Sequence, residues 1–264
     1  MKKIFIDGSA GTTGLRIFER LSSRTDITLL TLPEEERKDP ASRARALNTA
    51  DIAILCLPDV AAREAVSLIE NPDTVVLDTS TAHRTAPGWV YGFPELSPAQ
   101  AEAIRTAKRI AVPGCHASGF IALTAPLRAA GILPGGTLLS CFSLTGYSGG
   151  GKKMIAEYEM QPSPAKLHAP RQYALGQSHK HLPEMAAVSG LPAPVFCPVG
   201  GDFYSGSRCR CSRRSAYREP RKSGLRRSTG ISTGDPWSAS PKCRTRADSC
   251  PPLPFRERIP CRSA

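Results

Sequence analysis

The sequence predicts an α/β fold in which a doubly wound parallel sheet is followed by a smaller α+β domain. Three observations support this prediction. Short apolar segments alternate with helical stretches from residue 1 to about residue 115. These segments lack a strict alternation of apolar and polar residues, which indicates strands that are buried on both faces of a sheet. From about residue 138 the pattern changes to a longer strand and glycine-rich or polar loops.

The first 115 residues account for the parallel sheet. A glycine-containing turn at residues 8–14 joins the first expected strand to the first expected helix, in which Leu15, Phe18 and Leu21 share one face. The expected strands are residues 3–6, 27–32, 52–57, 74–77 and 109–112, and the expected helices are residues 15–21, 41–47, 61–69 and 120–127.

Residues 116–206 are expected to form the second domain. A long strand at 137–144 leads into the glycine-rich loop 146–151. A histidine-containing loop at 178–184 and an apolar strand at 193–199 follow. Because this succession is cut off in mid-sheet near residue 206, we expect the domain to be incomplete.

Residues 207–264 differ in composition from the rest of the chain. They hold 15 of the 35 Lys and Arg residues, 4 of the 23 Asp and Glu residues and five of the nine cysteines, without helical or alternating periodicity. Three interpretations are open: a disordered basic tail that binds nucleic acid or acidic partners, a metal module, or a shifted reading frame. The cysteines lack the Cys-x-x-Cys spacing of zinc modules. We favour the shifted frame, because the preceding domain stops abruptly.

The formal net charge of +12 belongs almost entirely to this tail, which carries +11 and leaves residues 1–206 with +1. The charge of the whole chain is therefore no indication that the folded part binds nucleic acid. The sequence has no apolar run long enough to span a membrane. Met1, Lys2 and Lys3 lead directly into an apolar strand without the pattern of a signal peptide. We expect a cytoplasmic protein.

Cys115 lies where a predicted strand gives way to a predicted helix, in the segment Val-Pro-Gly-Cys-His-Ala-Ser-Gly of residues 112–119. A thiol at a helix N-terminus faces unpaired backbone N–H groups and the positive end of the helix dipole. This environment favours the thiolate, the form that attacks a carbonyl carbon. Cys115 is therefore a candidate nucleophile, although a buried cysteine that acts as a small hydrophobic residue is the more common case.

The turn at residues 8–14 has the spacing Gly-x-x-Gly-x-x-Gly, a variant of the dinucleotide fingerprint. Glycines there let the backbone approach a pyrophosphate, whose charge then lies at the helix N-terminus. After the second strand, the glutamates at 34–36 could bind an adenosine 2′-hydroxyl, whereas Arg37 and Lys38 could bind a 2′-phosphate. NAD and NADP are both compatible with this pattern.

Two of the five histidines, His179 and His181, flank Lys180 in the loop that ends with Glu184. Histidine is the natural side chain to move a proton for a cysteine nucleophile near neutral pH, although two such histidines can also form a solvated surface. A pair of potential ligands without a third gives no zinc site, so we expect no metal. Arg84, after the strand at 74–77, could pair with an anionic substrate.

Six segments make the chain similar to one enzyme family, N-acetyl-γ-glutamyl-phosphate reductase in its shorter class. The resemblance covers residues 1 to about 206. Each segment alone is a weak signal, but six in order are specific. They are Gly-Ser-Ala-Gly-Thr-Thr-Gly at 8–14, Asp-x-Ser-x-x-His-Arg at 78–84, Tyr-Gly-Phe-Pro-Glu at 91–95, Pro-Gly-Cys-His at 113–116, Ser-Gly-Gly-Gly-Lys at 148–152 and His-Lys-His-Leu-Pro-Glu at 179–184.

The resemblance implies a Rossmann-like dinucleotide-binding domain at 1–115, a catalytic domain at 116–206, NADP as cofactor and a small acyl phosphate as substrate. It places Cys115 on the nucleophile and His179 and His181 on the acid–base loop. We also expect three residues to hold a substrate carboxylate or phosphate: Arg84, Ser148 and Lys152. The expected cofactor-binding residues are Gly8, Ser9, Gly11, Thr12, Thr13 and Gly14.

Two departures from the family pattern matter. The family often has an aromatic residue after the nucleophile, where this chain has His116. The family also continues past residue 206 with further strands and a final helix that returns to the nucleotide domain. Residues 207–264 lack that pattern, so the homo-oligomer expected for the family would have to form without it.

The activity implied by the resemblance is NADPH-dependent reduction of N-acetyl-γ-glutamyl phosphate to N-acetylglutamate semialdehyde and phosphate through a cysteine thioester, a step of arginine biosynthesis. Three alternatives stay open. One is an aspartate-semialdehyde dehydrogenase, which shares the architecture and the cysteine. Another is a nucleic-acid-binding protein that acts through its basic tail. The third is an inactive product whose first domain folds without catalysing.

Overall fold

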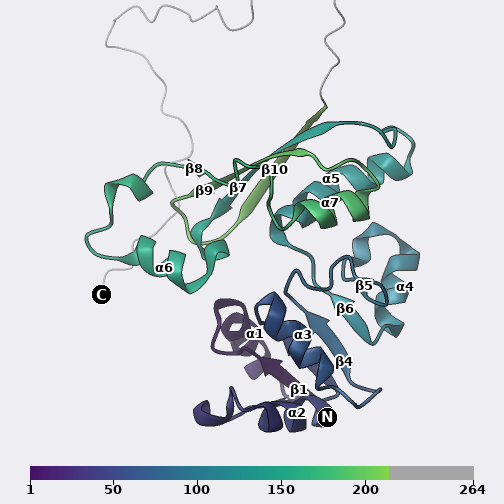
Figure 1. The fold of residues 1–264 in the computed structure, drawn as a ribbon, viewed down its shortest axis with the longest axis vertical. Coiled ribbons are helices and arrows are strands. Elements are labelled where there is room, and N and C mark those ends of the chain that lie inside the picture. The colour runs from purple at the N-terminus through teal and green to yellow at the C-terminus, as the bar shows by residue number, and fades with distance from the viewer. Residues whose placement is uncertain (214–264) are drawn as a thin grey trace, which may run out of the picture. The chain divides into compact units, whose positions relative to one another are not determined.

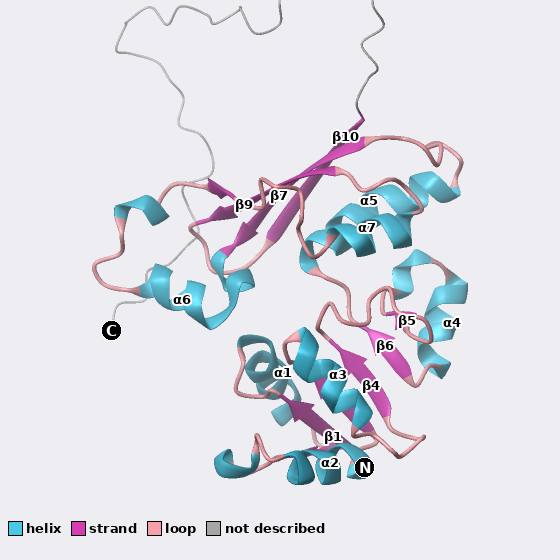
Figure 2. Cartoon of the chain, viewed as in Figure 1, coloured by secondary structure: helices cyan, strands magenta, loops and turns pink. Residues whose placement is uncertain are grey.

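Two sheets organise the part of the chain that the computed structural model describes, residues 1–213 (Figures 1 and 2). The first sheet is six-stranded and parallel throughout, with the order β2-β1-β3-β4-β6-β5. The predicted doubly wound parallel sheet is therefore confirmed. Its strands are β1 (Lys2–Asp7), β2 (Ile27–Leu30), β3 (Ile52–Leu55), β4 (Val75–Asp78), β5 (Val90–Tyr91) and β6 (Arg109–Ala111).

Helices connect these strands, because parallel neighbours need a crossover between them. Two helices begin at side-chain caps and have proline as their first residue. The Asp39 carboxylate accepts a hydrogen bond from Ser42 N, and the Ser97 hydroxyl accepts one from Gln100 N. The helices of this part are α1 (Thr12–Ser22), α2 (Pro40–Thr49), α3 (Asp59–Ser67) and α4 (Pro98–Thr106).

The strand order places a topological switch point between β1 and β3. The chain crosses from β1 to β2 on one side and returns to β3 on the other, so the carboxyl ends of β1 and β3 lie side by side. Gly8 follows the first of these ends and Cys56 follows the second. Open α/β sheets bind ligands in the crevice outside such a point.

The second sheet is mixed, with the order β10-β7-β9-β8. Strand β7 pairs in parallel with β9, while β10 and β8 pair antiparallel at the two edges. Helices α5 and α7 lie side by side against it (Figure 1) and enclose a core that contains Phe120, Ile121, Met185 and Phe196. The elements are α5 (Cys115–Ala129), β7 (Leu139–Gly146), α6 (Gly151–Glu159), β8 (Arg171–Gln172), α7 (Leu182–Ser189), β9 (Val195–Gly201) and β10 (Ser207–Arg213).

Strand β10 differs from the sequence-based expectation. Residues 207–213 belong to the segment that we expected to be disordered or out of frame, yet they pair with β7 along its full length. The strand has an alternating pattern that the basic composition of this segment concealed. Cys209 and Cys211 point to the same face, and the basic residues beside them are exposed. Residues 214–264 lie outside the described part, so the hypothesis of a shifted frame stays a prediction for them.

Several short elements were not predicted from the sequence. Glu184, expected in a loop, lies in the first turn of α7. Leu15, expected on the apolar face of α1, is 47% exposed. The described residues include no helix that is both long and apolar enough to cross a membrane. The additional elements are β5, α4, α6, β8, α7 and the 3-10 helices Glu34–Glu36, Pro94–Leu96, Tyr147–Gly150 and Ala165–Leu167.

Candidate active site

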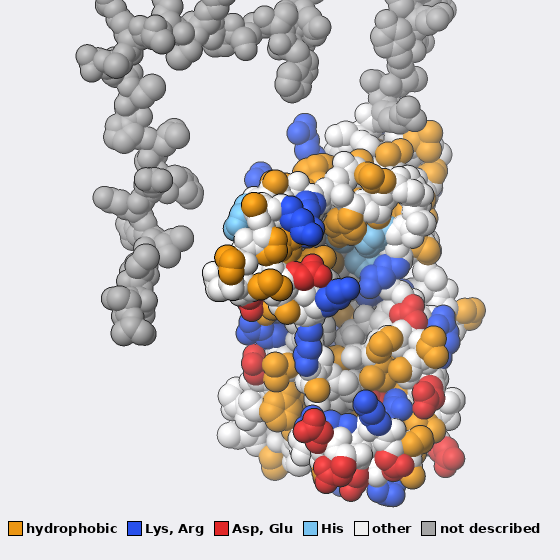
Figure 3. Space-filling model, turned by 60° about the vertical axis from the view of Figure 1, so that its left-hand side comes forward, with side chains coloured by type: hydrophobic (Ala, Val, Ile, Leu, Met, Phe, Trp, Pro, Cys, Tyr) orange, Lys and Arg blue, Asp and Glu red, His pale blue; other side chains and the backbone are white. Residues whose placement is uncertain are grey.

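A cavity of about 930 Å³ opens between the glycine turn and the second sheet. Thr12 and Thr13 line it from the start of α1, Cys115 from the start of α5, and His179 and His181 from the loop before α7. Histidine and basic side chains lie together at a recess in this part of the surface (Figure 3). The structure thus brings the predicted nucleophile, the predicted acid–base loop and part of the predicted cofactor turn to one cavity.

Cys115 is the first residue of α5, and its side chain is exposed to this cavity. The pKa of its thiol nevertheless lies above the ordinary value, because desolvation by the surrounding protein outweighs the hydrogen bond from His116 N and the charge of Arg84, which both lower it. This direction is opposite to the lowered pKa that we expected from the position of Cys115 at the helix N-terminus.

Gly114, which precedes Cys115, lies where the loop of the nucleophile comes very close to Arg84, His181 and Glu184. A Cβ atom at this position would lie 2.5 Å from Arg84 Nη1, 2.5 Å from His181 Nε2 and 2.6 Å from Glu184 Oε1. Such distances are far below van der Waals contact, so a side chain here would displace all three groups. The absence of a side chain at Gly114 lets the nucleophile's loop lie directly against the acid–base loop.

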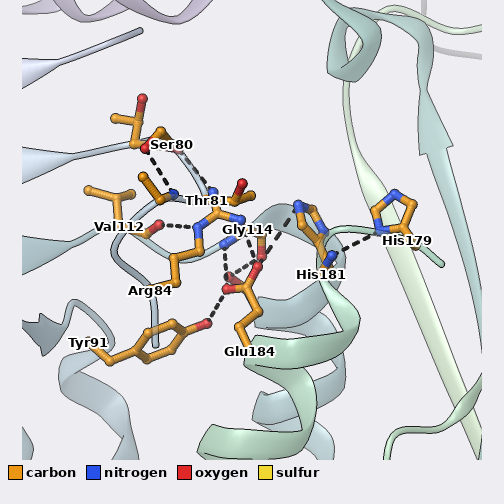
Figure 4. Close-up of polar contacts among 12 residues, drawn as sticks. Ser80, Thr81, Arg84, Tyr91, Val112, Gly114, His179, His181 and Glu184 are labelled. Carbon is orange, nitrogen blue, oxygen red and sulfur yellow. Dashed lines mark hydrogen bonds and ion pairs between the residues drawn. The ribbon is translucent and has the colours of Figure 1, made fainter. Parts of the chain in front are cut away.

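Glu184 holds this arrangement together (Figure 4). Its carboxylate is 1% exposed and accepts hydrogen bonds from Arg84 Nη1 at 2.6 Å, Tyr91 OH at 2.8 Å and Gly114 N at 3.1 Å. These donors come from three segments of the chain. Through these three bonds the Glu184 carboxylate ties α7 to the parallel sheet and to the start of α5.

His181 is buried beside Glu184, with its Nε2 atom 4.0 Å from Glu184 Oε1. Its Nδ1 atom is buried and has no hydrogen-bond partner among the described residues. Desolvation and the positive charge of Arg84 lower the pKa of His181 to about 2. His181 is therefore a neutral imidazole at neutral pH.

His179 lies nearer to solvent than His181. Its Nδ1 atom accepts a hydrogen bond of 3.1 Å from His181 N, and the two rings meet edge-on with centroids 4.7 Å apart. Desolvation and Lys180 lower the pKa of His179. The Nε2 atom of His179 takes no part in this hydrogen bond. His179 is therefore better suited than His181 to exchange protons with a ligand.

His116 is a site residue that sequence reasoning did not single out as functional. It is 2% exposed, and its ring bridges Ser143 Oγ at Nδ1 and Tyr173 OH at Nε2, each at 2.7 Å. Burial and nearby His179 lower the pKa of His116 to about 4. The signal was present in the sequence, since His116 follows the nucleophile directly. Its effect is to fix Tyr173 on the cavity wall.

The glycine turn divides into packing residues and ligand-facing residues. Gly8 has φ +85°, and a side chain there would collide with the Cys56 carbonyl, while one at Gly14 would collide with the Gly8 carbonyl. Gly11, Thr12 and Thr13 instead line a smaller cavity of about 290 Å³. Ser9 is half-buried and is not among the residues that line either cavity.

This smaller cavity fits an anionic group. It lies at the N-terminus of α1, whose first turn carries no acidic residue. Lys180 and Arg84 line its wall, as does the Asp59 carboxylate, which accepts hydrogen bonds from Thr81. A helix N-terminus with free N–H groups and a nearby lysine attracts phosphate. The residues present are therefore compatible with the pyrophosphate of a dinucleotide.

The three expected substrate contacts occupy different positions. All three nitrogens of the Arg84 guanidinium donate to protein oxygens: Nε to Val112 O, Nη1 to Glu184 and Nη2 to Thr79 O. Arg84 lines the cavity, but this engagement makes it a positioning residue. Ser148 lines the large cavity, whereas Lys152 is exposed and is not among the residues that line either cavity.

Comparison with known proteins agrees with the fold. Residues 3–104 match the family described as semialdehyde dehydrogenase, NAD binding domain. Residues 115–219 match the family described as semialdehyde dehydrogenase, dimerisation domain. Fold, site and these matches define a two-domain protein of the semialdehyde dehydrogenase class.

Similar proteins indicate which family within this class the chain belongs to. N-acetyl-gamma-glutamyl-phosphate reductase 2 of Pseudomonas putida is 53% identical over 204 residues, which cover 77% of this chain and 65% of that protein. The enzyme of that name from Sinorhizobium medicae is 53% identical over 207 residues, covering 77% of this chain and 67% of that protein. The chain belongs to the N-acetyl-gamma-glutamyl-phosphate reductase family. It spans about two thirds of the length of these relatives.

Solved structures with the same fold are more distant in sequence. A probable aspartate-semialdehyde dehydrogenase from Pseudomonas aeruginosa has a TM-score of 0.59 at 14% identity, with coverage of 80% of this chain and 74% of that chain. Aspartate semialdehyde dehydrogenase with NADP from Candida albicans has a TM-score of 0.58 at 16% identity, with coverage of 83% and 73%. These similarities support the architecture alone.

Proposed function

We propose that this chain catalyses the NADPH-dependent reduction of N-acetyl-γ-glutamyl phosphate to N-acetylglutamate semialdehyde and phosphate, as part of arginine biosynthesis. The observation that carries the proposal is the meeting of Cys115, His179 and the start of α1 at one cavity. The family membership supports the substrate class. The aspartyl phosphate alternative is less well supported, because relatives at about half identity carry the acetylglutamyl name.

In the proposed mechanism the Cys115 thiol loses its proton and its sulfur attacks the acyl carbon of the substrate. The bond from that carbon to the phosphate oxygen breaks, phosphate leaves, and a thioester forms on Cys115. When bound, NADPH supplies a hydride to the thioester carbon. The resulting thiohemiacetal then gives its hydroxyl proton to His179 and breaks its carbon–sulfur bond, which releases the semialdehyde and restores the thiolate.

His179 is the proposed acid–base residue. It takes the proton of Cys115 in the first step and protonates the forming alkoxide in the reduction step. The choice over His181 rests on the two environments. A buried imidazole with a pKa of about 2 neither accepts nor donates a proton readily at neutral pH, whereas His179 is half-buried and its pKa is lowered less. His181 instead positions His179 through its backbone N–H.

The cofactor is proposed to lie with its pyrophosphate at Gly11, Thr12 and Thr13. Arg37 and Lys38 follow β2, where a 2′-phosphate would be bound. The preference for NADPH over NADH is part of the proposal, and it is tested by the ratio of kcat/KM for the two cofactors. A ratio near one would contradict it.

The test of the proposed function is NADPH oxidation with two substrates, N-acetyl-γ-glutamyl phosphate and aspartyl phosphate. Cys115→Ser should abolish turnover of the first, and His179→Asn should lower kcat by about 10²–10⁴-fold. Cys197→Ser and His168→Asn are matched controls, because both residues lie outside the cavity. Full activity of Cys115→Ser, or a preference for aspartyl phosphate, would overturn the proposal.

The proposed active form is a homo-oligomer, which the match to a dimerisation domain supports. Because the chain spans about two thirds of its relatives' length, activity should also be measured after residues 207–264 are replaced by the corresponding C-terminal part of the Pseudomonas putida relative. Sedimentation of both forms measures the oligomeric state.

Deletion of residues 214–264, which leaves β10 (Ser207–Arg213) in place, tests the nucleic-acid alternative. Salt-dependent DNA binding that disappears with the tail would favour it.

A further inference from the structure

Three thiols lie on one face of the second sheet, and none of them lines the cavity that holds Cys115. Cys141 belongs to β7, and Cys209 and Cys211 belong to the neighbouring edge strand β10. Their antiparallel register pairs Cys211 with Cys141 and Cys209 with Ser143. Residues two apart on a strand share a face, so the three sulfurs lie together under α5.

The pair Cys141 and Cys211 has the geometry of a cross-strand disulfide. Residues directly opposite on an antiparallel ladder have Cα atoms about 4.5–5.5 Å apart, within the range of about 4.4–6.8 Å that disulfides adopt. Cys141 and Cys211 are directly opposite each other in this register, so their side chains are neighbours on the face under α5. Cys209 is the diagonal neighbour of Cys141. Diagonal neighbours have Cα atoms farther apart than this range, so a disulfide between these two residues would require the backbone to move.

Access differs between the two thiols in a way that allows stepwise oxidation. Cys141 is fully buried, whereas Cys211 is half-buried at the edge of the sheet. The neighbouring Cys141 side chain lowers the pKa of Cys211, which increases its thiolate fraction. Among the described residues, no three His, Cys, Asp or Glu side chains are placed to hold a metal ion, so the cluster is a thiol site.

We propose that Cys141 and Cys211 form a reversible disulfide across β7 and β10 when the protein meets a small-molecule disulfide such as oxidised glutathione. The Cys211 thiolate attacks one sulfur of the oxidant, breaks its S–S bond and releases one thiolate. Cys141 then gives up its proton and attacks the Cys211 sulfur of the mixed disulfide. The second small thiol leaves, so two protein thiols are oxidised and one disulfide is reduced to two thiols.

Cys209 assists the second step as the proton acceptor. Its sulfur lies 2.9 Å from Ser143 Oγ and also accepts a hydrogen bond from Cys141. These donors lower the pKa of Cys209 to about 6. A thiolate beside the buried Cys141 thiol provides the base that solvent cannot supply at that depth.

The experiment treats the full chain with oxidised glutathione, blocks remaining thiols and maps non-reduced tryptic peptides by mass spectrometry. Trypsin cleaves after Arg208, Arg210 and Arg213, so it separates Cys209 from Cys211. The expected product is the Cys141 peptide linked to the Cys211 peptide, with two hydrogens lost. A linkage of Cys141 to Cys209 or to a cysteine of residues 214–264, or a Cys141 that stays reduced, would overturn the proposal.

Matched variants keep the test independent of folding. Cys211→Ser should leave Cys141 reduced under the same treatment, and Cys197→Ser should form the linkage as the parent chain does, because Cys197 lies on the opposite face with Phe142. Cys209→Ser should give the same linkage several-fold more slowly. In the parent chain and in Cys197→Ser, oxidation should raise Tm by roughly 5–10 °C, since it closes a long loop of the unfolded chain. An equal rise in Cys211→Ser would contradict the assignment.

Discussion

The guanidinium of Arg84 donates to the carboxylate of Glu184 across 2.6 Å, although the two residues lie 100 positions apart in the chain. Both side chains are almost fully buried, at 8% and 2% exposure. Arg84 follows β4 of the parallel sheet and Glu184 lies in α7 of the second domain. The same carboxylate binds Gly114 N, so this ion pair holds the loop of the nucleophile between the two sheets.

Replacing Arg84 with Met should destabilise the protein by about 3–5 kcal/mol, because it leaves the Glu184 carboxylate buried without its cation. Urea denaturation measures the change. The control is Arg105→Met, which removes an exposed pair with Glu102 and should cost no more than about 1 kcal/mol. Similar losses for the two variants would contradict the structural role of Arg84.

Gly114→Ala should disrupt the site through steric overlap. The new methyl group would force apart Arg84, His181 and Glu184, at a cost of about 1–3 kcal/mol in stability and a larger relative loss of kcat. Gly136→Ala is the matched control, because a Cβ there meets nothing within 4 Å. Equal activity of the two alanine variants would show that the narrow contact behind Cys115 is unimportant.

Acid should destabilise the protein below about pH 6.5. His116 and His181 have pKa values lowered to about 4 and about 2 in the folded protein. In this window the unfolded chain binds more protons than the folded one, so stability falls as pH falls. The slope should be about 1.4 kcal/mol per pH unit for each histidine. Denaturation at several pH values should show a shallower slope for His116→Asn, and an unchanged slope would contradict the assignment.

Alkylation by iodoacetamide should distinguish two thiols by their pH profiles. The raised pKa of Cys115 predicts a rate that increases about tenfold per pH unit to beyond pH 8.5. The pKa of Cys209, lowered to about 6, predicts a rate that levels off above that pH. Peptide mass spectrometry reads both in one sample. A Cys115 rate that is flat above pH 7 would instead support a thiol ionised by the helix N-terminus alone.

The parallel sheet and the central residues of the site could be predicted because their signals are local. Apolar strands, the glycine turn and the Pro-Gly-Cys-His segment each lie within a few consecutive residues, and parallel topology brings strand ends to one edge. Cys115, His179 and His181 accordingly meet at the predicted place.

The rest depended on contacts between distant segments. Arg84 was expected to hold substrate because an isolated arginine after a strand resembles an anion site. Its partner Glu184 lies 100 positions away in the chain, so the local sequence does not indicate the ion pair. His116 was overlooked because its two partners, Ser143 and Tyr173, come from other elements. The raised pKa of Cys115 followed from desolvation, which local sequence does not report.

Strand β10 sets a limit on how far the chain can be shortened. A Cβ atom on Gly119 of α5 would collide with the Cys209 sulfur, so the helix that begins with Cys115 rests directly on β10. A version that ended at Gly206 would strip one side of that helix and expose the Cys141 side of β7. Shortened versions of the chain should therefore keep β10 through Arg213.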